Sequence, residues 1–265
     1  VIGLKSLHYA LLAAGHRSVL LFLPAFDAND ASSHDALRAF IADTAPGFVG
    51  VSLMSTEYYR ACEVTAVVRE AVQAPVVWGG IHPTIAPETC LDHADVACIG
   101  EGERTIVDIA STLERDGNLR TVKNLCFREG GGLRRNELYP YLEDLDRLPV
   151  PDHVPASSFV LSGRRIVPLT LENFGLYARY RGTSYSIMSS RGCPFSCTYC
   201  CNNFLAGLYH TKKVRRRSIP HVIGELEQAV RDFPAISLVN FQDDSFLTTD
   251  AASLREFSGE YRRRV

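Results

Sequence analysis

The first half of the chain alternates short apolar runs with amphipathic stretches. The apolar runs are rich in β-branched residues and show no polar alternation, which fits strands that are buried on both faces. The amphipathic stretches between them fit helices that cross from one strand to the next. The pattern predicts an α/β fold of the Rossmann or flavodoxin kind, with a parallel sheet covered on both sides. The predicted strands are residues 18–24, 47–54, 75–80 and 95–100, and the predicted helices are 34–45, 57–72 and 103–117.

The loops after these strands are candidate ligand sites, because ligands of such sheets bind at the carboxyl ends of the strands. Two of the loops are rich in glycine, which lets a backbone approach a ligand closely and leaves amides free for a polar group. The glycines fit neither the GxGxxG dinucleotide motif nor the GxxxxGK(S/T) phosphate loop, so ordinary nucleotide binding is not indicated. The candidate residues are Ser52, Met54, Gly79, Gly80, His82, Glu101 and Gly102.

The middle of the chain predicts a domain boundary. Residues 119–138 fit two short strands joined by the glycine-rich turn at 129–132, a hairpin that closes the first domain. Acids and prolines follow, and prolines stop helices and stiffen a connection. Beyond them a strand, a helix and a second strand fit the start of a (β/α) barrel. The predicted parts are a sheet domain with its hairpin at 1–139, a linker at 140–179 and the N-terminal part of the barrel at 180–265.

Three cysteines form a tight motif after the strand predicted at 185–188. Cys193, Cys197 and Cys200 have the spacing CxxxCxxC. Three thiolates on one short loop can hold three corners of a 4Fe-4S cluster and leave the fourth iron open for another ligand. A structural zinc ion with His210 or Cys201 as fourth ligand is the alternative, although zinc motifs usually come as two separated pairs of ligands. We expect Cys201 to take no part in the cluster.

Composition narrows the class of protein. The chain has 265 residues, is 46% hydrophobic and carries a formal net charge of -2, so it is globular and has no overall attraction for nucleic acid. No apolar run is long enough to span a bilayer, and a cytoplasmic location is the default expectation. The eight cysteines do not form a secreted disulfide framework. We interpret the basic run at 212–217 as a solvated surface, and His8, His153 and His221 as structural.

Several stretches resemble one family. The serine at the end of one strand and the later double glycine resemble elements of cobalamin-binding domains, and the stretches GLKSLHYALLAAGH, WGGIHPTIAPE and IGEGERT resemble the cobalamin-binding domain that precedes a radical AdoMet domain. The CxxxCxxC motif is the signature of the radical AdoMet superfamily. The stretch FQDDSF resembles the second-strand motif of its cobalamin-dependent group. The chain is identified on these motifs as a member of the cobalamin-binding radical AdoMet enzymes.

The resemblance implies three cofactors: cobalamin, S-adenosyl-L-methionine (AdoMet) and a 4Fe-4S cluster. Ser52, Gly79, Gly80 and His82 would contact the cobalamin tail and corrin, and Met54, Glu101 and Gly102 lie in the same motifs. Cys193, Cys197 and Cys200 would bind the cluster and are therefore the catalytic and metal-binding residues. Tyr199 occupies the position that contacts the adenine of AdoMet. Asp243 and Asp244 would face AdoMet or substrate, with the capping of a following turn or helix as the alternative.

The implied activity is reductive cleavage of AdoMet followed by methylation of an unactivated carbon of a small-molecule substrate. A low-potential donor such as flavodoxin or ferredoxin would supply the electron. A radical cyclase or rearrangement enzyme without methyl transfer is one alternative, and a non-catalytic cobalamin-binding or metal-binding sensor is another. The chain begins without methionine inside a helical pattern and ends in another at 262–265, so we expect a fragment cut at both ends. A full barrel takes ~250 residues, and only its first two units are expected here.

Overall fold

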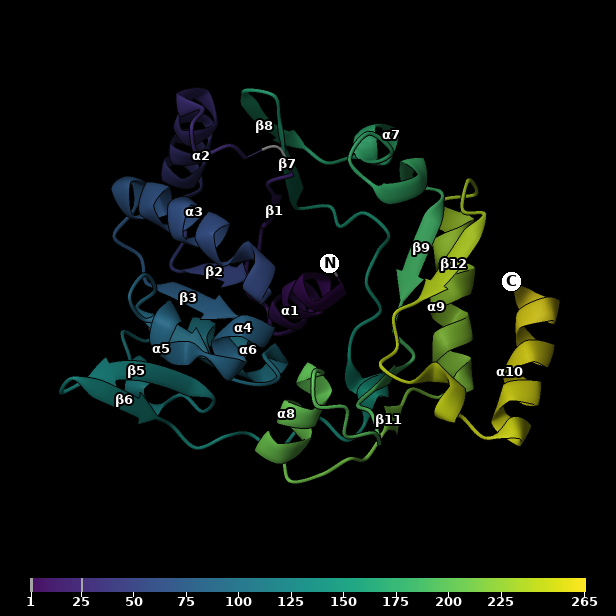
Figure 1. Cartoon of the computed structure of the whole chain (residues 1–265). Helices are drawn as coiled ribbons and strands as arrows, with labels where there is room; N and C mark the ends of the chain where they lie inside the picture. The colour runs from purple at the N-terminus through teal and green to yellow at the C-terminus, as the bar shows by residue number, and fades with distance from the viewer. Residues whose placement is uncertain (1, 25) are drawn as a thin grey trace. The chain divides into compact units, whose positions relative to one another are not determined.

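The computed structural model describes residues 2–24 and 26–265, which form two compact units (Figure 1). The sheet unit comprises Ala10–Tyr141 and Ser157–Pro168. The cysteine unit comprises the chain up to Tyr9 together with Leu142–Ala156 and Leu169–Val265. Among the described helices, none combines the length and the apolar character that a bilayer crossing requires.

The sheet unit is built on a five-stranded sheet of order β2-β3-β4-β5-β6. Strands β2, β3 and β4 are parallel, whereas β5 and β6 continue the sheet as an antiparallel hairpin. The parallel strands predicted from the apolar runs are therefore confirmed, and the residues expected to form a hairpin do so. The strands are β2 (Val49–Ser52), β3 (Val76–Gly79), β4 (Val96–Cys98), β5 (Leu125–Glu129) and β6 (Gly132–Arg135).

A second sheet differs from the sequence prediction. Strand β1 (Leu20–Phe22), expected beside the other parallel strands, pairs instead with β7 (Ser158–Ser162), which pairs in turn with β8 (Arg165–Pro168). The segment 140–179, predicted as a linker, therefore contains a hairpin. Its turn uses Gly163 at a φ of 57°, a conformation that glycine adopts without strain. The hairpin forms because it buries Val160 and Leu161 completely.

Helices fill the connections of the sheet unit. Asp30 begins α2 by accepting a hydrogen bond from the Ser32 amide, which satisfies one of the free donors at a helix start. Two short helices after β3 were not foreseen from the sequence. The helices are α2 (Ala31–Thr44), α3 (Tyr58–Ala71), α4 (Ile81–Ile85), α5 (Pro87–Cys90) and α6 (Glu103–Leu113). Helix α1 (Ile2–Ala13) precedes β1 and belongs to the cysteine unit as far as Tyr9.

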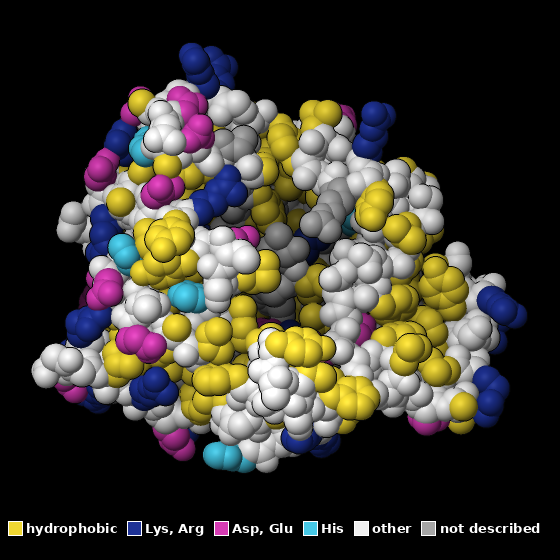
Figure 2. Space-filling model, in the orientation of Figure 1, with side chains coloured by type: hydrophobic (Ala, Val, Ile, Leu, Met, Phe, Trp, Pro, Cys, Tyr) yellow, Lys and Arg dark blue, Asp and Glu magenta, His cyan; other side chains and the backbone are white. Residues whose placement is uncertain are grey.

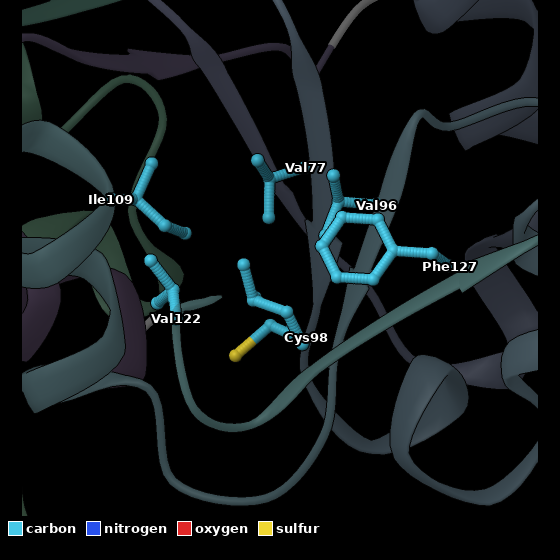
Figure 3. Close-up of a cluster of buried hydrophobic side chains, with 7 residues drawn as sticks. Val77, Val96, Cys98, Ile109, Val122 and Phe127 are labelled. Atoms are coloured by element: carbon cyan, nitrogen blue, oxygen red, sulfur yellow. The ribbon is translucent and has the colours of Figure 1, made fainter. Parts of the chain in front are cut away.

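The core of the five-stranded sheet lies under α6. Val77 and Val96 from the parallel strands meet Ile109 of α6 and Phe127 of the hairpin (Figure 3). Ile109 is completely buried, and burial of such a side chain contributes about 1.5–3 kcal/mol. Cys98 lies in the same cluster, and burial raises the pKa of its thiol to about 12. This cysteine is therefore a core residue that remains protonated.

The cysteine unit contains a strand, helix and strand of the kind expected at the start of a barrel. Strands β9 and β12 run parallel and side by side, with α9 between them in sequence (Figure 1). The face of α9 that carries Val222, Leu226 and Ala229 packs on Tyr185 and Ile187 of β9. The elements are α7 (Leu171–Phe174), β9 (Ser184–Ile187), β10 (Ser190–Arg191), α8 (Cys201–Leu208), β11 (Arg215–Arg216), α9 (Ile219–Asp232), β12 (Leu238–Phe241) and α10 (Ala251–Arg264).

Hydrophobic side chains remain at the surface of this unit over β12 and α10 (Figure 2). Leu238 of β12 is 46% exposed, and Leu247, between β12 and α10, is 87% exposed. The two-stranded sheet buries its apolar residues against α9, and Phe257 and Tyr261 of α10 pack against the same cluster.

The basic run at 212–217 is only partly the solvated surface that the sequence suggested, since Lys212 and Lys213 are exposed. Arg215 is 8% exposed and donates to the Leu142 carbonyl at 2.8 Å. Arg217 pairs with Glu225 at 2.6 Å, and their side chains are 10% and 4% exposed. Buried charges require such partners. The prediction is wrong for Arg215 and Arg217, because the sequence pattern does not show which basic side chains find partners inside the unit.

His153 lies in an aromatic cage of the cysteine unit. Its ring contacts Phe174, Phe233 and Tyr185 with centroid distances of 4.8, 5.0 and 5.4 Å. Burial, assisted by the nearby Lys5 charge, lowers the pKa of His153 from 6.5 to about 4. The structural role expected for this histidine fits these contacts, because the imidazole is held neutral at physiological pH.

We expect His153 to make the unfolding free energy dependent on pH. Between pH 6.5 and about 4 the unfolded chain binds a proton that folded His153 does not, so stability falls as the pH decreases across this window. His153→Phe should reduce the stability lost between pH 7 and pH 4.5 by about 2 kcal/mol, measured by urea unfolding at both values.

The matched control for this experiment is His210→Asn. His210 is exposed, and its φ of 52° is one that asparagine tolerates. This variant should keep the pH dependence of the wild-type protein. An unchanged pH dependence in His153→Phe would show that the imidazole is not kept neutral by its cage.

Candidate functional site

The carboxyl edge of the five-stranded sheet brings three predicted residues together. Ser52 ends β2 and Gly79 ends β3, and the two are register partners in the parallel pair. The Leu53 amide donates to the Gly79 carbonyl at 3.0 Å, which keeps the two loops in contact beyond the strands. Ser52 and Gly80 are both exposed. The serine and the double glycine therefore lie at one place, as expected for neighbouring parallel strands.

Gly80 is the position in this loop that excludes a side chain. Its φ is 100°, in the region that favours glycine. A Cβ atom there would lie 2.8 Å from the Leu53 carbonyl oxygen and 3.2 Å from Ser52 Oγ. By contrast, a Cβ atom on Gly79 would meet only the Cβ of Cys98, at an ordinary contact distance of 3.7 Å. The bare backbone of Gly80 thus closes the loop against Ser52 and Leu53.

Thr84 joins the loops after β3 and β4, and sequence reasoning missed it. Its side chain is buried, donates to the Gly80 carbonyl at 2.7 Å and accepts from the Gly100 amide at 3.0 Å. Next to Gly100, the Glu101 carbonyl accepts from the side chain of Asn124 at 2.8 Å. The signal available in the sequence was a hydroxyl residue four positions after a loop glycine, where it can return to the glycine carbonyl.

His82 lies in the same region but has both ring nitrogens engaged. Nδ1 lies 2.9 Å from Ser55 Oγ and Nε2 lies 3.2 Å from Thr89 Oγ1, and the ring contacts Tyr58 at a centroid distance of 5.0 Å. These contacts fix the ring against α3 and α5. The corrin contact expected of His82 stays a prediction.

Exposed apolar side chains flank this edge. Met54, after β2, is 56% exposed, and Tyr59, at the start of α3, is 81% exposed. Figure 2 shows hydrophobic and histidine side chains together on the surface over α3 to α5. Large side chains left in water in this way mark a surface suited to a flat apolar ligand. Tyr59 was not among the residues expected from the sequence, although the adjacent tyrosines Tyr58 and Tyr59 are visible there. Gly102 begins α6, beside this edge.

The cysteine loop, residues 192–200, connects β10 to α8 in the cysteine unit. Cys193 and Cys200 are half-buried and Cys197 is exposed, and all three are free thiols. Cys200 is the N-cap residue of α8. Cys201 is the first residue of the helix, and burial raises the pKa of its thiol. The loop thus follows the β9 strand, as the sequence predicts.

The three cysteine side chains of the loop are chemically suited to bind an iron–sulfur cluster. Cysteine thiolates are the ligands of such clusters, and none of the three cysteines here forms a disulfide. Over the described residues no group of three His, Cys, Asp or Glu side chains is already close enough to hold a metal ion. Tyr199 is 91% exposed, and the nearby Cys197 raises the pKa of its hydroxyl. Its ring is therefore accessible to a planar ligand.

Asp243 and Asp244 follow β12 and reach the start of the cysteine loop. Asp243 accepts hydrogen bonds from the amide and hydroxyl of Ser189, at 3.2 and 2.7 Å, and from the hydroxyl of Ser190. Asp244 accepts from the Gly192 amide at 2.9 Å. The structure thus brings two predicted cofactor residues to the cysteine loop, while their contact with a cofactor stays a prediction. The three partner residues were not foreseen.

Residues 1–110 match the B12 binding domain family. Over 207 residues the chain is 28% identical to an uncharacterized methyltransferase of Pyrococcus horikoshii, a match that covers 76% of this chain and 40% of that protein. Over 211 residues it is 27% identical to the anaerobic magnesium-protoporphyrin IX monomethyl ester cyclase of Cereibacter sphaeroides, with coverages of 77% and 31%. The chain thus spans less than half the length of either relative.

A solved structure shares the fold over nearly the whole chain. It is the radical S-adenosylmethionine methyltransferase TsrM from Kitasatospora setae, with cobalamin and a [4Fe-4S] cluster bound. The TM-score is 0.72 at 20% identity, and the match covers 99% of this chain and 48% of that one. The likeness confirms the fold predicted from the sequence, a Rossmann-like domain followed by the first part of a (β/α) barrel.

We expect Gly80→Ala to destabilise the sheet unit, whereas Gly79→Ala should be tolerated. The first change places a Cβ atom against the backbone of Leu53 at an unfavourable φ, which costs about 1–3 kcal/mol in strain. The second change adds an ordinary contact with Cys98. Urea unfolding of the two variants measures the difference. Equal stabilities would show that the loop relaxes to accept a side chain at position 80.

Proposed function

Since residues 1–110 match a B12 binding domain and the chain has the fold of a cobalamin-dependent radical AdoMet enzyme, we propose that it forms part of such an enzyme. The proposed reaction is reductive cleavage of AdoMet and methylation of an unactivated carbon of a small molecule. The observation that carries the proposal is a loop of three free thiols after a barrel strand, in a chain that also has a cobalamin-binding domain. The name of the Pyrococcus horikoshii relative supports methyl transfer.

The cysteine loop would hold the cluster and AdoMet. Cys193, Cys197 and Cys200 provide three thiolate ligands, and the iron they leave open is suited to the amino and carboxylate groups of AdoMet. When bound, such a cluster supplies the electron for cleavage of AdoMet. Tyr199 offers an exposed ring on which the adenine can stack. A low-potential protein such as flavodoxin or ferredoxin is the proposed source of the electron.

The edge of the sheet unit would hold cobalamin. Ser52 offers an exposed hydroxyl for the nucleotide tail, and Gly79 and Gly80 bring their backbone to the same edge. Exposed Met54 and Tyr59 suit the apolar face of a corrin ring. We place His82, Glu101 and Gly102 at the border of the same site. These residues would bind and orient the cofactor and exclude water from it.

A radical cyclase reaction without methyl transfer is the second candidate function. The observation that favours it is the 27% identity to the anaerobic cyclase of Cereibacter sphaeroides over 77% of this chain. The two candidates use the same cysteine loop and the same cofactors. They differ in whether a labelled methyl group from AdoMet appears in the product.

We expect Cys197→Ala to abolish AdoMet cleavage and leave cobalamin binding intact. The change removes one of the three proposed cluster ligands, and Cys197 belongs to the cysteine unit rather than to the sheet unit. After anaerobic reconstitution, EPR of the reduced protein with and without AdoMet reports the cluster, and 5'-deoxyadenosine release reports cleavage. Cobalamin binding is followed by its visible absorption.

The matched control is Cys201→Ala, which removes the adjacent thiol but none of the proposed ligands. This variant should retain the cluster and its EPR response to AdoMet. Cleavage that persists in Cys197→Ala, or stoichiometric zinc in place of iron, would contradict the proposal. Cobalamin binding with neither cluster nor turnover in the wild-type protein would favour a sensor.

A further inference from the structure

Two segments far apart in the sequence hold the base of the cysteine loop. The loop leaves β10, which pairs with β11 through Ser190↔Arg216 and Arg191↔Arg215. The acids after β12 reach the same place, 54 and 52 positions away in sequence. The loop base, defined here as residues 189–192, therefore has partners on both sides.

Asp243 is fully engaged at the loop base. Oδ1 accepts from the hydroxyls of Ser189 and Ser190, and Oδ2 accepts from the Ser189 amide at 3.2 Å. Ser190 is completely buried. Hydrogen bonds to a charged acceptor are about twice as strong as neutral ones. Three donors bond to the one carboxylate of Asp243. A side chain with a single acceptor oxygen could not accept all three of these hydrogen bonds.

Asp244 and Gly192 complete the arrangement. The Gly192 amide donates to Asp244 Oδ2 at 2.9 Å, one residue before the first cysteine of the motif. Gly192 has a φ of 98°, and a Cβ atom there would lie 2.7 Å from the Lys213 carbonyl oxygen. The backbone at Gly192 thus lies closely between the segment that precedes β11 and the acid after β12. In contrast, the residues from 194 to 199 are all exposed.

We propose that Asp243 and Asp244 form a carboxylate clamp that fixes the loop base before any metal binds. The two acids are positioning residues, which act through Ser189, Ser190 and Gly192. The purpose of the clamp rests on the proposed function: holding Cys193 in place lowers the ordering cost of assembling a cluster on the loop. The clamp itself is a property of the metal-free chain.

Hydrogen exchange of the metal-free protein, resolved to single amides, tests the clamp. The Asp243→Asn side chain keeps one acceptor oxygen, and its new NH2 group would face the hydrogen-bond donors of Ser189 and Ser190. The Ser189 amide should therefore exchange roughly tenfold faster. Asp244→Asn keeps an acceptor for Gly192 and should change its exchange by less than about threefold, whereas Asp244→Ala should change it roughly tenfold. Asp243→Asn should also speed alkylation of Cys193 relative to Cys201.

Two further variants separate the clamp from general destabilisation. Asp250→Asn is the matched control, because this acid caps α10 through Ala252 and Ser253 and should leave the loop base unaffected. Ser190→Ala removes one donor to Asp243 and should reproduce part of the increase in exchange of the Ser189 amide. This variant also tests the clamp if Asp243→Asn fails to fold. In every variant used, the amides of β9 and α9 should remain as protected as in the wild-type protein.

The outcomes distinguish the clamp from the proposed function. Unchanged exchange at Ser189 in both Asp243→Asn and Ser190→Ala overturns the clamp, and so does equal exchange at Gly192 in the two Asp244 variants. A weaker EPR response to AdoMet in Asp243→Asn with normal exchange would assign this acid to cofactor contact instead. If the wild-type chain assembles no cluster while the exchange differences appear, the clamp stands and the proposed function fails.

Discussion

A buried ion pair holds the parts of the cysteine unit together. Arg217 and Glu225 pair inside the unit, and the hydroxyl of Tyr185 donates to the same carboxylate at 2.7 Å. Removing one member of such a pair leaves an uncompensated charge and typically costs about 3–5 kcal/mol. The main chain of Arg217 also donates to the Ser189 carbonyl at 2.9 Å. One residue therefore links the core of α9 and β9 to the strand that precedes the cysteine loop.

The elements that dominate the fold could be predicted because each depends on local pattern. The run at 75–80 is apolar without interruption, and β3 is buried as such a run requires. The three cysteines were found by spacing, which needs no knowledge of the fold. Ser52 and Gly79 were predicted to be neighbours because parallel strands end at a common edge, and their register pairs them.

The features that the sequence did not predict depend on distant partners. The β7–β8 hairpin lies in a segment rich in prolines and acids, and it forms because β1 supplies an edge for pairing. The partners of Asp243 follow from the parallel register of β9 and β12, which sets Ile187 opposite Phe241. No pattern within FQDDSF contains that information. Likewise, the burial of Arg215 and Arg217 in the basic run depends on where the surrounding unit places β11.

Thr84 gives the sheet unit a mechanical property. Its hydroxyl donates to the carbonyl of Gly80 and accepts from the amide of Gly100, so the loops after β3 and β4 share one side chain. Valine has nearly the same shape and would fill the same volume, but it would leave both backbone groups without this partner. A displacement of either loop must therefore stretch a bond to the other. The hydroxyl of Thr84 thus couples the positions of the two loops to each other.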